Sequence, residues 1–122
     1  MENKTVLVIE DDAMNMKLVR ALLKIGGYSI LEAIHAEAGI LLAEKHRPNL
    51  ILMDIQLPGM DGLTATRIIR NTPYINEIGV VALSSHAMYG DEKKAAEAGC
   101  NGYITKPIDT RKFLTKIVRY MR

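Results

Sequence analysis

The 122-residue chain contains little cysteine and few aromatic side chains. Cys100 is its single cysteine, which excludes a disulfide framework within the chain and favours a reducing compartment. We expect this residue to pack as a small core side chain. Five Tyr, one Phe and no Trp leave few rings on which the bases of a single-stranded nucleic acid could stack.

The sequence also lacks a large excess of positive or negative side chains, and it has no long hydrophobic run. The formal net charge is +2 and no basic stripe is present, so we expect no direct binding to nucleic acid. No apolar run approaches the roughly 20 residues that span a bilayer. The N-terminal residues lack the basic and apolar regions of a signal peptide. A cytoplasmic protein without membrane insertion is therefore expected.

Apolar residues make up 48% of the sequence and charged residues 25%, as is usual for a globular protein with its own core. Because we find no linker or internal repeat, residues 1–122 are expected to form one domain. Short apolar runs rich in β-branched residues predict strands buried on both faces, as in a parallel sheet. With two weaker runs they give the expected strands: Thr5–Ile9, Tyr28–Ala33, Asn49–Met53, Gly79–Leu83 and Gly102–Thr105.

Helical patterns alternate with these strands. The first ends at Gly26-Gly27, a good helix stop, and the second breaks before Pro48. The expected helices are Met14–Ile25, Ala36–His46, Leu63–Arg70, Asp91–Ala98 and Thr110–Met121. Such alternation implies a parallel sheet with helices on both faces. The predicted fold class is α/β, a flavodoxin-like (βα)5 doubly wound sheet of five parallel strands in the order 2-1-3-4-5.

Carboxylates gather where the first and third strands end. Glu10 and Asp11 follow the first strand, and Asp54 follows the third. Open α/β sheets bind ligands outside the carboxyl ends of their strands, where the strand order reverses, and here that point lies between these two strands. Converging carboxylates repel one another unless a cation relieves them, and a hard ion such as Mg²⁺ suits oxygen ligands. The alternative is that the acids cap helices, a role that suits Asp12.

Ser84 and Lys106 follow the fourth and fifth strands at the same predicted edge. A phosphoryl group on Asp54 would carry about two negative charges. The Lys106 ammonium and the Ser84 hydroxyl are suitable partners for its oxygens. Carboxylates are established nucleophiles for phosphoryl groups, and such transfer depends mainly on positioning and charge neutralisation. Each residue taken alone would more often be a surface charge or a turn residue.

Four segments together resemble the receiver domain of bacterial response regulators, over essentially the whole chain. Each is weak by itself, but their order and spacing are specific. The segments are Val8–Asp12, Leu52–Gly62, Val81–Ala87 and Tyr103–Pro107. A narrower resemblance, to single-domain regulators of the cell-cycle type and to receivers attached to hybrid histidine kinases, rests on Glu10–Asp12, Met14–Lys17 and Met53–Pro58.

The resemblance implies a phosphoacceptor and a metal site. Asp54 would accept the phosphoryl group. Asp11 and Asp54 would bind Mg²⁺ directly, Glu10 would often act through water, and the backbone carbonyl of Gln56 would be a further ligand.

The resemblance also implies a switch. Lys106 would pair with the phosphoryl group, and Ser84, where Thr is commoner, would be the switch hydroxyl. Tyr103 would turn inward when Ser84 is drawn to the phosphate. Gln56 and His86 would tune dephosphorylation.

Partners follow from the same resemblance. A sensor histidine kinase or phosphotransferase would donate the phosphoryl group, and the chain would catalyse only its own phosphorylation and dephosphorylation. The output would be protein binding through the fourth helix, fifth strand and fifth helix, around Met88, Tyr103 and Lys112. The chain would be a monomer or a phosphorylation-linked dimer, and its Lys106-Pro107 bond would be cis.

Other functions fit the sequence less well. A phosphatase of the haloacid dehalogenase type needs a second Asp two residues beyond Asp54, where this chain has Gln56. A flavodoxin needs a phosphate-binding loop after the first strand, where this chain has three acids. No Gly-x-Ser-x-Gly elbow surrounds Ser84, and no P-loop is present.

Overall fold

The computed structural model describes residues 3–85 and 90–121. Five parallel strands form one sheet in the order β2-β1-β3-β4-β5, which confirms the predicted topology. The strands are β1 (Thr5–Ile9), β2 (Ser29–Ala33), β3 (Leu50–Asp54), β4 (Gly79–Ser84) and β5 (Gly102–Thr105). The helices are α1 (Ala13–Ile25), α2 (Ala36–His46), α3 (Gly62–Arg70), α4 (Asp91–Ala98) and α5 (Phe113–Val118).

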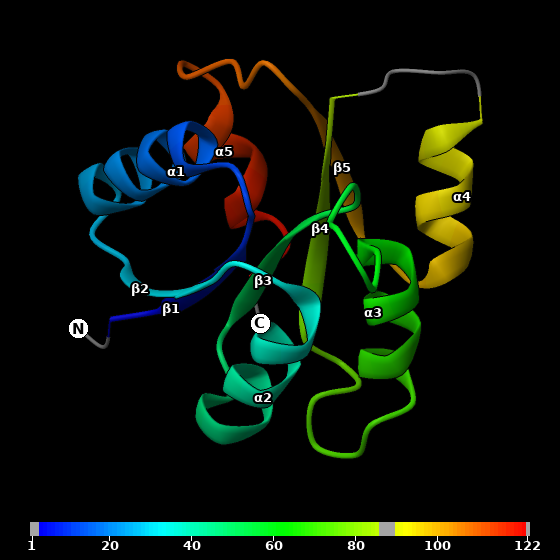
Figure 1. The fold of residues 1–122 in the computed structure, drawn as a ribbon. Coiled ribbons are helices and arrows are strands. Elements are labelled where there is room, and N and C mark those ends of the chain that lie inside the picture. Colours follow the sequence, from blue (N-terminus) through cyan, green and yellow to red (C-terminus); the bar gives the residue numbers. More distant parts are fainter. Residues whose placement is uncertain (1–2, 86–89, 122) are drawn as a thin grey trace.

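Helices cover both faces of the sheet (Figure 1). The helices α1 and α5 lie on one face, and α2, α3 and α4 lie on the other. Successive side chains of a strand point to opposite faces. Val6 and Val8 therefore pack with α1 and α5, whereas Leu7 and Ile9 pack with α2 and α3. Burial on both faces explains why the central strands are continuous apolar runs.

Local signals in the sequence set most helix ends. The side chain of Asp12 accepts a hydrogen bond from the Asn15 backbone N–H at 3.0 Å and so caps α1, as its type predicts. Gly27 follows α1 with a φ of +82°, a conformation that suits a residue without a Cβ atom. Among the described helices, none combines the length and apolarity needed to cross a membrane.

The last helix is shorter than predicted at both ends. The Asp109 carboxylate accepts a hydrogen bond from the Arg111 N–H at 3.0 Å, which forms a turn before the helix. The N–H groups of Tyr120 and Met121 bond to carbonyls three residues earlier, so the backbone after Val118 tightens into turns. Phe113 and Ile117 are buried, so the segment packs through an apolar helical face. Local turns decide where the helix begins and ends.

Two strands extend one residue further than predicted. Asp54 is the last residue of β3 and pairs with Leu83, and Ser84 is the last residue of β4 and pairs with Thr105. Both polar residues were expected just after their strands. The sheet itself, rather than a loop, therefore fixes the backbone of each.

Candidate phosphorylation and metal site

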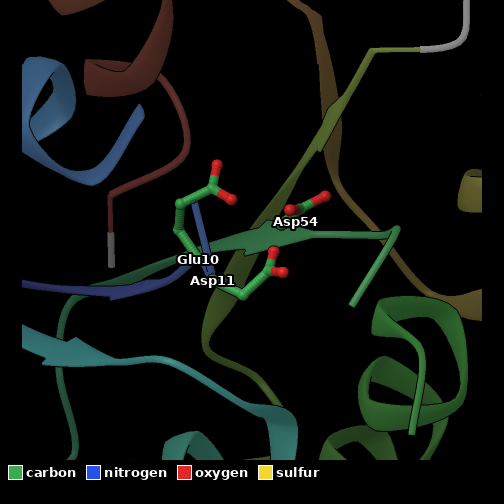
Figure 2. Close-up of side chains that lie close together, drawn as sticks. All are labelled: Glu10, Asp11 and Asp54. Atoms are coloured by element: carbon green, nitrogen blue, oxygen red, sulfur yellow. The ribbon is translucent and has the colours of Figure 1, made fainter. Parts of the chain in front are cut away.

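Three carboxylates meet at the carboxyl edge of the sheet (Figure 2). Glu10 and Asp11 follow β1, and Asp54 ends β3, which lies beside β1. One carboxylate oxygen from each lies within 4.8 Å of the others. Glu10 and Asp54 are buried, with relative exposures of 1% and 3%, whereas Asp11 is exposed. The convergence predicted from the strand order is therefore present, with two acids held out of water and one at the surface.

Lys106 reaches this cluster from the end of β5. Its Nζ atom lies 2.6 Å from Glu10 Oε1 and 3.3 Å from Asp54 Oδ2. Burial by itself would lower the pKa of Lys106, but the hydrogen bond with Glu10 and the charge of Asp54 outweigh it and raise the pKa above 10.5. The ammonium is therefore charged at neutral pH, and the Lys106-Pro107 bond that follows is cis, as expected.

The Glu10 carboxyl is difficult to ionise in this position. Burial, followed by its hydrogen bond with Asp54, raises the pKa of Glu10 from 4.5 to about 7, although Lys106 opposes the change. One ammonium thus does not fully offset two buried carboxylates. The donor set consists of oxygen atoms with excess negative charge, which fits a hard divalent cation.

Gln56 lies beside the phosphoacceptor candidate and beside Ser84. Its backbone N–H donates to Asp54 Oδ1 at 2.9 Å, and its side-chain Nε2 donates to Ser84 Oγ at 3.3 Å. Its Oε1 accepts hydrogen bonds from the hydroxyl (2.8 Å) and the backbone N–H (3.2 Å) of Ser85. Ser84 is fully buried, whereas Gln56 and Ser85 are exposed. The contact with Ser85 was not predicted, since it joins two loops 29 residues apart.

A sequence profile of the response regulator receiver domain family matches residues 6–118, almost the whole chain. The chain is a member of the response regulator receiver domain family. It is therefore a signalling domain of two-component systems, and receiver domains accept phosphoryl groups from histidine kinases or phosphotransferases.

Curated relatives of this receiver domain include single-domain regulators. It is 40% identical over 118 residues to the polar-differentiation response regulator DivK of Brucella anthropi, covering 97% of this chain and 96% of that protein. The DivK protein of Brucella ovis is 39% identical with the same coverage. These similarities confirm the narrower resemblance to single-domain regulators of the cell-cycle type.

Solved structures show the same fold. The receiver domain of sensor histidine kinase PA1611 from Pseudomonas aeruginosa PAO1 is 30% identical, with a TM-score of 0.90 over 98% of both chains. That structure has a magnesium ion coordinated in its active-site cleft. The chemotaxis response regulator CheY4 of Vibrio cholerae has a TM-score of 0.91 over 98% of this chain and 99% of its own at 20% identity, which shows the fold alone.

The remaining predicted residues lie away from the acids or outside the described residues. Tyr103 is half-buried on β5 and lines a cavity of about 220 Å³ next to α4, together with Cys100 and Tyr120. Cys100 is half-buried rather than fully buried, and burial raises the pKa of its thiol. His86 and Met88 lie outside the described residues.

Proposed function

We propose that residues 1–122 form a receiver domain that accepts a phosphoryl group on Asp54 in a Mg²⁺-dependent reaction and passes the signal on by binding a protein. The observation that supports this most directly is the convergence of Glu10, Asp11 and Asp54 with the Lys106 ammonium at one sheet edge. The donor would be a sensor histidine kinase or a phosphotransferase.

Asp11 and Asp54 would hold the metal directly, Glu10 would act through water, and the Gln56 carbonyl would complete the protein ligands. Bound Mg²⁺ would neutralise phosphoryl oxygens and relieve the repulsion between the carboxylates. The magnesium ion in the PA1611 receiver domain supports this assignment.

The transfer itself needs no general base. An Asp54 oxygen attacks phosphorus while the bond from phosphorus to the donor nitrogen breaks, and the leaving imidazole keeps the electron pair. Lys106 is already 3.3 Å from Asp54 Oδ2 and would pair with the transferred oxygens. The Ser84 hydroxyl would donate a hydrogen bond to these oxygens. The domain would thus catalyse only its own phosphorylation and dephosphorylation, with Gln56 and His86 tuning the second reaction.

The output would be a change of the surface formed by α4, β5 and α5. When Ser84 is drawn to the phosphate, Tyr103 would turn inward, and the cavity that it lines offers room beside α4. A target protein would read this surface around Tyr103, Lys112 and Met88. The domain would act in the cytoplasm, as a monomer or as a phosphorylation-linked dimer.

Phosphorylation by acetyl phosphate, followed by intact-mass spectrometry, tests the assignment. Wild type should gain one phosphoryl group with Mg²⁺ and remain unmodified with a chelator, and Asp54→Asn should not gain it. Asp61→Asn is a matched control, because Asp61 is an exposed cap of α3 and Asn also caps helices. A modified Asp54→Asn protein, or a wild type that no phosphodonor or histidine kinase modifies, would contradict the proposal.

A further inference from the structure

The side chain of Gln56 joins the loop after β3 to the end of β4. Its amide nitrogen contacts Ser84 Oγ, and its amide oxygen contacts Ser85 through two hydrogen bonds. The backbone N–H of the same residue holds Asp54 Oδ1. Gln56 therefore touches the proposed phosphoacceptor with its main chain and both serines with its side chain.

The backbone of Ser85 fixes the direction of these hydrogen bonds. A backbone N–H only donates, so the Gln56 atom that faces it must be the carboxamide oxygen. The NH₂ group of Gln56 then faces Ser84, and this group also only donates. Ser84 Oγ must therefore accept, and its own hydrogen must turn toward a different acceptor.

We propose that the hydrogen bonds from Ser85 through Gln56 to Ser84 form a relay that fixes the Ser84 hydroxyl as a donor toward the phosphoryl group on Asp54. The inference rests on the proposed phosphorylation of Asp54. A hydroxyl that accepts one hydrogen bond donates more strongly in the next, because hydrogen bonds in a chain polarise one another. Gln56 and Ser85 are thus positioning residues that act through Ser84.

A simple tie between two loops predicts something different. Met would remove such a tie, whereas Glu could still accept both hydrogen bonds from Ser85. Apart from the charge of the carboxylate, Met should then cost at least as much as Glu. In the relay, Glu reverses the direction, because a carboxylate only accepts and would draw the Ser84 hydrogen to itself. Met removes the donor without offering a competing acceptor, so it should cost less than Glu.

Binding of beryllofluoride, which mimics a phosphoryl group on a carboxylate, measures the relay directly. Fluorine NMR titrations with saturating Mg²⁺ would compare Gln56→Glu and Gln56→Met, each with and without Ser84→Ala. We expect Gln56→Glu to weaken binding about thirtyfold when Ser84 is present, as for a lost hydrogen bond to a charged group. Without the hydroxyl, only charge repulsion from an exposed carboxylate remains, about threefold. The coupling in this double-mutant cycle is then about tenfold, or ~1.4 kcal/mol.

Ser85→Ala should change the affinity by only about twofold, because the backbone N–H still orients Gln56. Ser29→Ala, at an exposed serine on β2, is its matched control. An equal loss for Gln56→Glu with and without Ser84 would overturn the relay, as would an equal loss for Glu and Met. Should Gln56→Glu fail to fold, the Gln56→Met pair tests the same coupling.

The wild type and Asp54→Asn separate this inference from the proposed function. If Asp54→Asn abolishes the binding seen in wild type, Asp54 is the phosphoacceptor. If the effects of the substitutions at Gln56 and Ser84 are then additive, the relay is overturned while the phosphoacceptor assignment stands. A wild type that does not bind beryllofluoride overturns both.

Discussion

Replacing Glu10 with Gln should remove a pH-dependent loss of stability from the metal-free protein. The pKa of Glu10 is raised from 4.5 to about 7 in the folded state, so between these values the folded chain holds more protons than the unfolded chain. Its unfolding free energy must then fall as the pH rises through this range. At ~1.4 kcal/mol per pH unit, the loss approaches ~3 kcal/mol above the folded pKa. Glu10→Gln has no charge to bury, so its stability should not show this loss.

Urea unfolding followed by far-UV circular dichroism, with a chelator present, would measure the effect between about pH 4.5 and about pH 8. The quantity to compare is the difference in unfolding free energy between variant and wild type, because every other contribution is common to both. Glu44→Gln, at an exposed glutamate on α2, should follow wild type. Parallel curves for wild type and Glu10→Gln would refute the reasoning, since they would mean that burial and Asp54 do not hold Glu10 protonated. Saturating Mg²⁺ should stabilise wild type, by ~2.7 kcal/mol at a hundredfold excess over its dissociation constant.

Three further predictions concern single positions. Lys106→Met should lower the unfolding free energy at about pH 8 by ~3 kcal/mol, because it leaves two buried carboxylates without their cation, and urea titration would show this; unchanged stability would argue against the ion pairs. Gly62→Ala should destabilise the fold by ~2 kcal/mol and slow phosphorylation by acetyl phosphate, because the new Cβ would press on the Asp54 carbonyl. Gly79→Ala, at the start of β4, would press on the Tyr120 carbonyl instead, so it should destabilise the fold without slowing phosphorylation. Asp12→Ala should cost ~1 kcal/mol in urea unfolding through the lost cap of α1, without change in the phosphoryl gain.

The sequence predicts the parts of this fold that depend on local patterns. Apolar runs such as Ile51–Met53 favour buried strands, and their alternation with helical patterns leaves few topologies. Polar residues at strand ends then predict that Glu10, Asp11 and Asp54 converge. The start of α5 could not be predicted, because it depends on whether the Asp109 side chain forms a turn.

The pKa values and the hydrogen bonds of the site could not be predicted from local patterns. The raised pKa of Glu10 depends on how far its carboxyl is from water and from Asp54, and both are results of packing. The bridge from Gln56 to Ser85 depends on the relative placement of two loops, for which sequence spacing gives no signal. The sequence predicts which residues stand at the strand ends, but not the contacts that change their pKa values and orientations.

The contact between Lys106 and Glu10 determines when, during synthesis and folding of the chain, the site can form. These residues are 96 positions apart, so the site draws on the first strand and the last. A nascent chain that has emerged only as far as β4 carries the acids but not the ammonium that offsets them. Such an intermediate should be a poor substrate for a phosphodonor. The reactivity of Asp54 would thus report that β5 has joined the sheet.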